Sequence, residues 1–168
     1  MQSVIPGLLS SILLLSVSHL SWSQEHRSIP QTTNLQRDAE LASQAGRPIL
    51  LMVSQDHCTY CDLMKREVLH PMELGGDYKN RIVMREILID MGLEITNFQG
   101  QRQDATEFFH GYGVRLTPTL LFLDPLGNEL ADRIVGINTV EFLNFYLDAA
   151  IDEATEKMPS RTPPMRLP

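Results

Sequence analysis

The chain has 168 residues, of which 43% are hydrophobic and 21% are charged, and its formal net charge is −7. These values are typical of a single globular domain with a core of ordinary size. The acidic balance, without a basic cluster anywhere along the chain, argues against binding to nucleic acid or to an anionic membrane surface.

The first 23 residues contain no Lys, Arg, Asp or Glu, and the run from Val4 to Val17 is mostly Leu, Ile, Val and Ser. This run is too short for a comfortable membrane span. Small residues on either side of Trp22 are typical of a cleavage site. We therefore expect residues 1–23 to be a secretory signal that is removed after Ser23. An uncleaved anchor is the alternative, because no Lys or Arg precedes the run.

The first part of the mature chain predicts a linker, a helix and a strand. Residues 24–33 are polar and are predicted to form a linker to one domain, which spans residues 34–157. A capping box of Thr33 and Gln36 is expected to begin a helix that Gly46 ends. Residues 48–54 then form an apolar run of strand length.

The middle of the chain predicts a helix, a second strand and an insertion. The helix after residue 54 is expected to stop at Pro71, because proline disfavours a helical residue before it, and a glycine-rich connection follows. Residues 81–90 are rich in Ile, Val and Leu and predict a strand buried on both faces. Residues 91–103 are expected to form a small hairpin that projects from the domain.

The last part of the chain predicts two helices around a strand pair. Asp104 and Glu107 form a capping box for a short helix. Residues 119–123 and 129–135 are expected to pair as antiparallel strands, since Pro and Gly between them favour a tight turn. A final helix is predicted to begin at a cap of Asn138 and Glu141, and residues 158–168 are predicted to be a disordered tail. Its expected buried face comprises Val140, Leu143, Leu147 and Ile151, broadened by Phe142, Phe145 and Tyr146.

The two cysteines of the chain, Cys58 and Cys61, lie where the strand at 48–54 passes into a helix. The first turn of a helix presents unpaired backbone N–H groups and the positive end of the helix dipole, and both favour a thiolate. We therefore predict that Cys58 is the reactive sulfur. Cys61 lies on the same helix face at a separation that a disulfide can bridge, so it can resolve a mixed disulfide on Cys58 by exchange.

Other roles for a Cys-x-x-Cys pair are less well supported. Zinc would need two more ligands, and His57, His70 and His110 supply no recognisable second half of a site. Covalent haem attachment requires histidine directly after the second cysteine, where this chain has Asp62. A purely structural disulfide across so short a loop would stabilise the fold only weakly. We predict redox chemistry without a metal or a dissociable cofactor, and we assign no role to His70 or His110.

The order of the predicted elements over residues 34–156 resembles the thioredoxin fold, an α/β fold with a central mixed β-sheet flanked by helices. One motif that carries the resemblance is Cys58-Thr59-Tyr60-Cys61 after the apolar strand. The other is Gly113-Val114-Arg115-Leu116-Thr117-Pro118-Thr119 before the strand at 119–123.

The resemblance also implies a substrate-binding site. In thioredoxin-like proteins the proline of the second motif, here Pro118, is cis and faces the cysteines. Thr117 and Pro118 are therefore expected to bind the substrate backbone by strand addition. Tyr60 and His57, which flank the cysteines, are further candidates, although Tyr60 can equally serve packing. Met52 stands where relatives have a buried acid that moves a proton at the second cysteine, so water or another group must do that work.

Within the superfamily the chain looks most similar to exported SoxW-type thioredoxins and related periplasmic thiol:disulfide reductases. The resemblance implies a periplasmic monomer that reduces disulfides of exported client proteins and regains electrons from a membrane thiol-transfer protein. The helix end and a protonated His57 favour a thiolate at Cys58, whereas Asp56 and Asp62 oppose it. Nothing adds a clear positive charge that would stabilise the reduced form unusually well, which favours a reductase over an oxidase or isomerase. A non-catalytic binding or redox-sensing module is the alternative of a different class.

Overall fold

The computed structural model describes residues 29–90, 92–137 and 139–159. The predicted signal, the first part of the predicted linker, Asn138 and all but the start of the predicted tail lie outside these ranges. Within the described ranges, no helix combines the length and the apolar character that crossing a membrane requires.

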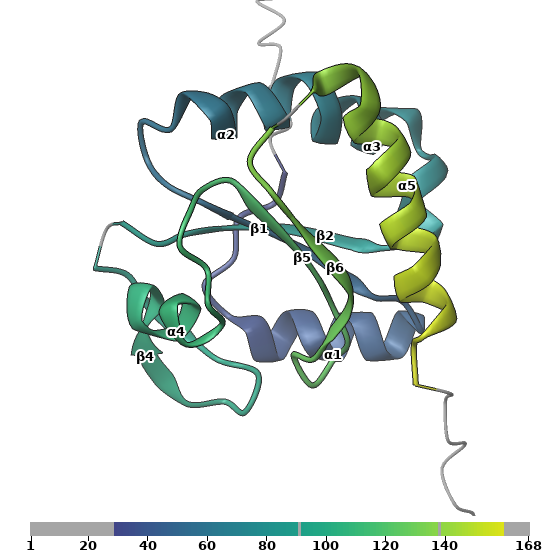
Figure 1. Cartoon of the computed structure of the whole chain (residues 1–168). Helices are drawn as coiled ribbons and strands as arrows, with labels where there is room; N and C mark the ends of the chain where they lie inside the picture. The colour runs from purple at the N-terminus through teal and green to yellow at the C-terminus, as the bar shows by residue number, and fades with distance from the viewer. Residues whose placement is uncertain (1–28, 91, 138, 160–168) are drawn as a thin grey trace, which may run out of the picture.

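Four strands form the central sheet in the order β2-β1-β5-β6. They are β1 (Ile49–Ser54), β2 (Val83–Leu88), β5 (Thr119–Leu123) and β6 (Glu129–Val135). β1 and β2 are parallel, whereas β5 pairs antiparallel with both β1 and β6. The sheet is therefore mixed, as predicted (Figure 1).

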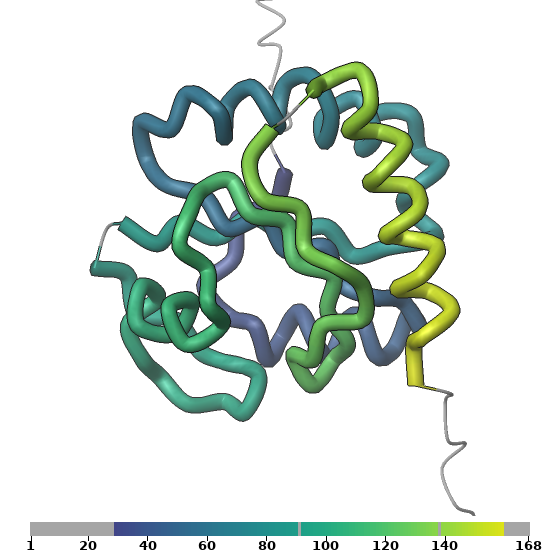
Figure 2. Tube along the Cα trace, viewed as in Figure 1, coloured from purple at the N-terminus to yellow at the C-terminus, as the bar shows by residue number. Residues whose placement is uncertain are grey.

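Helices cover both faces of the sheet, as Figures 1 and 2 show. They are α1 (Leu35–Ala45), α2 (Thr59–Met64), α3 (His70–Gly75), α4 (Ala105–Gly111) and α5 (Val140–Glu156). β1 is buried along its whole length, and its alternate side chains enter two separate cores because strand residues alternate between faces. Leu50 and Met52 pack with α2, α3 and α5, whereas Leu51 and Val53 pack with α1 and α4.

The first helix begins one residue later than predicted. Asn34, and not Thr33, is the N-cap of α1, and its side chain accepts a hydrogen bond of 2.9 Å from the backbone N–H of Arg37. Gly46 ends the helix in a left-handed conformation, with φ of 67°, which confirms the predicted C-cap.

β2 is an edge strand, so the prediction of a strand buried on both faces is wrong. Only Glu86 and Ile87 of its residues are buried. The described end of the predicted linker lies along this edge, where the backbone N–H of Thr32 donates to the carbonyl of Glu86 at 2.9 Å. Ile29 beside it is fully buried, so residues before 34 pack against the domain.

Pro71 does not stop the helix that follows the cysteines. α2 continues through a π-helical turn, η1 (Lys65–Leu69), into α3. Pro71 lies in the first turn of α3, where a missing N–H is tolerated. The wider turn before it bonds the N–H of His70 to the carbonyl of Lys65. The connection to β2 is correspondingly short and contains a 3₁₀ turn, η2 (Asp77–Asn80).

The predicted hairpin forms, but it does not project from the domain. Its strands β3 (Glu94–Thr96) and β4 (Arg102–Asp104) pair antiparallel. The N–H of Thr96 donates to the carbonyl of Thr33 at 2.8 Å, which ties β3 to the start of α1. Ile95 and Phe98 are buried in the same core as Phe109 of α4. The hairpin is therefore part of that core, because its few apolar side chains point inward.

The final helix buries a narrower face than predicted. Leu143, Leu147 and Ile151 are buried, and Ala150 and Ala154 complete the stripe. The three aromatic side chains expected to broaden this face are instead 60–70% exposed: Phe142, Phe145 and Tyr146. Only one side of α5 packs on the sheet, so these three aromatic side chains, which lie next to the buried stripe on the helix surface, are exposed to solvent.

Candidate active site

Cys58 and Cys61 form a disulfide bond, with their Cα atoms 5.1 Å apart. Cys58 is the N-cap of α2, and its Sγ accepts a hydrogen bond of 3.1 Å from the backbone N–H of Cys61. Cys61 is fully buried, whereas Cys58 is partly exposed. Cys58 is therefore the sulfur that a second molecule can reach.

The position of Cys58 predicts a difference in reactivity between the two thiols of the reduced protein. A helix N-terminus, where here the N–H of Cys61 is directed at Sγ of Cys58, stabilises a thiolate relative to a thiol. We expect iodoacetamide at mildly acidic pH to alkylate Cys58 at least about tenfold faster than Cys61, since one pKa unit changes the thiolate fraction about tenfold. Mass mapping after short exposure measures the ratio, and faster labelling of Cys61 would overturn the assignment.

The loop before β5 lies against the accessible sulfur. Oγ1 of Thr117 is 3.7 Å from Sγ of Cys58 and donates a hydrogen bond of 2.8 Å to Oε1 of Gln55. The Thr117–Pro118 peptide bond is cis. The carbonyl of Pro118 accepts a hydrogen bond of 2.8 Å from the N–H of Gly136. Three of the predicted site residues, Cys58, Cys61 and Thr117, thus lie together, with Pro118 next to them.

The remaining predicted residues lie at the exposed rim of the site. The side chain of His57 is 95% exposed, with Nε2 3.6 Å from Oδ2 of Asp56. Tyr60 is 62% exposed, and Leu116, which the sequence reasoning did not select, is 66% exposed. Tyr60 follows Cys58 by two residues, and Leu116 precedes Thr117. The sulfur is therefore surrounded by exposed, partly apolar side chains that suit contact with another protein.

A buried charged cluster lies on the same face of the sheet as Cys61, and sequence reasoning missed it. Glu86 is fully buried, and its Oε1 accepts a hydrogen bond of 2.7 Å from the Ser54 hydroxyl. Nζ of Lys65 lies 3.1 Å from the same oxygen and 3.2 Å from Oδ1 of Asp62. Burial alone would lower the pKa of Lys65, but the hydrogen bonds and charges of Glu86 and Asp62 outweigh it and raise the pKa. The sequence signal was an acid next to Arg85 in a strand whose other residues are apolar.

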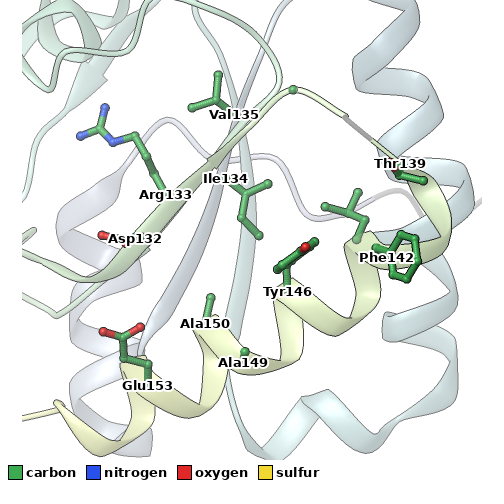
Figure 3. Close-up of a pocket in the computed structure, with 12 residues that line it drawn as sticks. Asp132, Arg133, Ile134, Val135, Thr139, Phe142, Tyr146, Ala149, Ala150 and Glu153 are labelled. Carbon is green, nitrogen blue, oxygen red and sulfur yellow. The ribbon is translucent and has the colours of Figure 1, made fainter.

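A roomy groove lies away from the sulfurs, between β6 and α5. It encloses about 480 Å³, and Val135, Phe142 and Tyr146 are among its lining residues, whereas neither cysteine is (Figure 3). Exchange with a protein disulfide requires an accessible sulfur and not an enclosed cavity, so the volume of this groove does not mark the reactive site. Among the residues described, no group of three His, Cys, Asp or Glu side chains could hold a metal ion.

The chemistry open to this site is thiol–disulfide exchange. Two neighbouring sulfurs store one electron pair, and one of them is open to attack by, or on, a second molecule. The class of protein that such a pair defines is a thiol:disulfide oxidoreductase. It needs no cofactor, because both electrons reside in Cys58 and Cys61.

The chain belongs to the thioredoxin-like domain family, whose family model matches residues 35–151. Its architecture is accordingly the thioredoxin fold, as the sequence resemblance implied. No curated protein sequence matches the chain.

Solved thioredoxins have the same fold at low sequence identity. A thioredoxin of Malassezia sympodialis is 14% identical with a TM-score of 0.52, and the match covers 77% of this chain and 93% of that one. Mitochondrial thioredoxin 3 of Saccharomyces cerevisiae, in its oxidised form, is 18% identical with a TM-score of 0.50, over 76% and 97% of the two chains. Fasciola hepatica thioredoxin is 18% identical with a TM-score of 0.50, over 74% and 98%.

Proposed function

We propose that the protein is an exported thiol:disulfide reductase that acts on disulfides of exported client proteins, as SoxW-type thioredoxins and related periplasmic reductases do. The observation that carries the proposal is the asymmetry of the redox pair. One sulfur, on Cys58, reaches the surface at a helix N-terminus, while its partner on Cys61 is fully buried. This arrangement separates the role of attack from the role of resolution.

The exchange proceeds in two balanced steps. The Cys58 thiolate attacks one sulfur of the client disulfide, and the other client sulfur leaves as a thiolate that takes up a proton. Cys61 then loses its proton and attacks Sγ of Cys58, which releases the second client thiolate and leaves the Cys58–Cys61 disulfide. Two electrons pass from the protein to the client, and a separate dithiol must return them. Thr117 and Pro118, beside Cys58, are placed to bind the client backbone as an added strand.

The charges around the pair favour the reducing direction. Asp56 and Asp62 flank the cysteines and Glu86 is fully buried on the neighbouring strand, and the single ammonium of Lys65, which contacts Asp62 and Glu86, offsets only part of this negative charge. Negative charge destabilises a thiolate, and a dithiol whose reduced form is less stabilised gives up its electrons more readily. Equilibration with glutathione and dithiothreitol is expected to give a potential more negative than about −220 mV. A value near that of a strong oxidant, about −120 mV, would favour an oxidase instead.

A turnover assay separates catalysis from mere binding. In dithiothreitol, the protein is expected to accelerate insulin reduction, because a catalyst regenerates its dithiol after each exchange. A protein that binds oxidised clients but leaves the rate of insulin reduction unchanged would be a binding or sensing module.

The proposed export and partners follow from residues 1–23 and from the family resemblance. We propose a monomer in a bacterial periplasm, reduced by a membrane thiol-transfer protein. Fractionation of a C-terminally tagged chain, with its intact mass, tests the location and the removal of residues 1–23. Recovery of the full-length chain from the cytoplasm would contradict it.

The exposed rim predicts a selective defect in client recognition. Tyr60→Ala combined with Leu116→Ala removes apolar contact area next to Cys58 without touching the sulfurs. We expect KM for a protein disulfide to rise several-fold, while the rate with a small aromatic disulfide stays within about twofold, since burial of one such side chain contributes about 1.5–3 kcal/mol at most. The matched control is Leu126→Ala, a residue 70% exposed in the turn between β5 and β6. An equal loss with both substrates would assign the two residues to the exchange step instead.

A further inference from the structure

Aromatic side chains are exposed on the outer side of α5, next to the stripe that packs on the sheet. Phe142 and Tyr146 lie four residues apart, so they share one helix face, and they are 62% and 60% exposed. Both line the groove between β6 and α5, together with Ile134 and Ala149 (Figure 3). Exposed apolar side chains that are grouped around a groove are typical of a binding surface. The groove is therefore expected to hold another segment of protein.

The two ends of the groove differ in chemistry. Asp132 of β6 and Glu153 of α5 line it toward the C-terminal end of the helix, whereas Phe142 lies at the other end (Figure 3). Arg133 also lines the groove, but its guanidinium is already paired with a carboxylate of the same strand. Glu153 pairs with Lys157 at the end of the helix, whereas Asp132 is exposed. A segment that fits this groove has a positive charge at one end and apolar side chains at the other.

The chain carries a segment of this kind a few residues after α5. Residues 160–168 read Ser-Arg-Thr-Pro-Pro-Met-Arg-Leu-Pro, with two arginines and no acidic residue. The helix itself has five acidic residues and no Lys or Arg, so the two segments are complementary in charge. Prolines preset an extended conformation, which lowers the entropy lost when such a segment binds an aromatic groove. Methionine and leucine supply the apolar side chains that the far end of the groove requires.

The segment is long enough to follow the groove. Met158 is partly buried and packs against the core on which α5 lies, so the chain remains on the domain after the helix ends. An extended segment rich in proline advances about 3.1 Å per residue, so residues 160–168 can span about 28 Å. The helix from Glu153 back to Thr139 is about 21 Å long, at a rise of about 1.5 Å per residue. The difference leaves room for the chain to reverse its direction.

β6 is the outermost strand of the sheet, which adds a reason to cover this groove. The backbone groups on the free edge of an outer strand can pair with a strand of another molecule, and native proteins commonly cover such edges or place proline on them. Residues 160–168 contain three prolines, which have no N–H to donate. A segment bound here would therefore protect the edge without creating a new one.

We propose that residues 160–168 fold back along α5 and bind in the groove between β6 and α5. Arg161 lies beside Asp132, at the end of the groove where the helix ends. The two prolines that follow cover the small side chains in the middle of the groove, and Met165 packs on Phe142. The segment has too few apolar residues to fold alone, and it becomes ordered on this surface. The bound segment leaves both cysteines open, because neither lines the groove.

Trypsin digestion of the full chain tests the proposal, because Arg161 and Arg166 are cleavage sites within the segment. We expect the wild type to be cleaved after these residues about tenfold more slowly than a free peptide of residues 158–168, since proteolysis follows the population of the unbound form. Phe142→Ala combined with Tyr146→Ala removes the aromatic lining and should raise the cleavage rate to near that of the peptide. Intact-mass measurements over time give the rates.

Phe145→Ala is the matched control, because Phe145 is 70% exposed on the same helix and does not line the groove. It should leave the cleavage rates at those of the wild type. A charge exchange tests the placement of the segment. Asp132→Lys and Arg161→Glu should each raise cleavage after Arg166 several-fold, and the two together should restore protection, since a double-mutant cycle isolates the pairwise interaction.

The outcomes are distinguishable from those of the proposed client reduction. Cleavage of the wild type at the rate of the free peptide would overturn the proposal, as would an equal effect of Phe145→Ala and the groove variant. Protection that rises with protein concentration would assign the groove to a second copy of the chain and would also overturn it. If the groove variant does not fold, the charge exchange decides, because Asp132 is exposed, and a failure to restore protection overturns the placement. None of these rates involves a client or the cysteines, so a failure of insulin reduction would count against the proposed function alone.

Discussion

Cys61→Ser is expected to abolish catalytic turnover with protein disulfides while leaving Cys58 able to attack. Serine cannot displace a client from the mixed disulfide, so adducts between Cys58 and its clients should accumulate. Loss of one member of a set of catalytic residues that act together can lower turnover by about ten-thousandfold or more. Non-reducing gels of an extract that contains oxidised clients, followed by mass spectrometry of the shifted bands, measure the trapping.

Cys58→Ser is the control for this experiment. It leaves only Cys61, which is fully buried beneath the helix, so no adducts are expected although turnover is equally lost. Adducts on Cys61 in the Cys58→Ser variant, without adducts in Cys61→Ser, would reverse the roles of the two sulfurs.

The parts of the fold that depend on local chemistry could be predicted from the sequence. Gly46 ends α1 in the left-handed conformation that glycine favours, and Asp104 caps α4 by accepting a hydrogen bond of 3.0 Å from the N–H of Glu107. The β5–β6 pair also follows from its turn, in which Asp124 accepts from the backbone N–H groups of Leu126 and Asn128. In each case the partners lie within four residues, so the signal is contained in the sequence.

Pro71 shows where a local rule fails. Proline removes one helical donor and crowds the residue before it, which normally ends a helix. Here the π-helical turn at Lys65–Leu69 changes the hydrogen-bond pattern just before Pro71, so the helix continues to Gly75. Packing of Val68, Leu69 and Met72 into the core compensates for the local disruption. In this helix, burial of apolar side chains beyond Pro71 outweighs the effect of the proline, so the helix ends at Gly75 and not at Pro71.

The candidate site likewise contains residues that local sequence features identify and residues that only the tertiary structure brings together. Cys58 and Cys61 are recognisable because their spacing and their place between a strand and a helix are local features. Glu86 lies on β2 and Lys65 lies in the helix that follows β1. The two residues meet because β2 pairs with β1 in a particular register, and no sequence pattern in β1 or β2 fixes that register. Met52 stands where relatives have a buried acid, and the buried carboxylate of this chain, on Glu86, lies on the neighbouring strand, where no pattern near the cysteines points to it.

Phe109→Ala is expected to lower the stability of the fold strongly. Phe109 of α4 is fully buried, and its ring lies 5.0 Å from that of Phe108 in an edge-to-face arrangement. It packs in the core that joins α1, the β3–β4 hairpin and the sheet. Removal of a buried phenyl ring typically lowers the free energy of unfolding by about 3–5 kcal/mol, through lost burial and the cavity that remains. Urea unfolding followed by circular dichroism measures the change.

The matched control is Phe145→Ala on α5, which removes the same atoms from a side chain that is 70% exposed. Its ring lies 5.8 Å from that of Tyr146 and borders solvent, so the expected change is within about 0.5 kcal/mol. A typical domain is stable by about 5–15 kcal/mol, so Phe109→Ala should unfold at markedly lower urea concentration whereas Phe145→Ala should not. Equal destabilisation by the two substitutions would mean that the hairpin and α4 do not share a core with the sheet. In that case the position of the loop between α4 and β5, which contains Thr117, would not depend on the packing of Phe109.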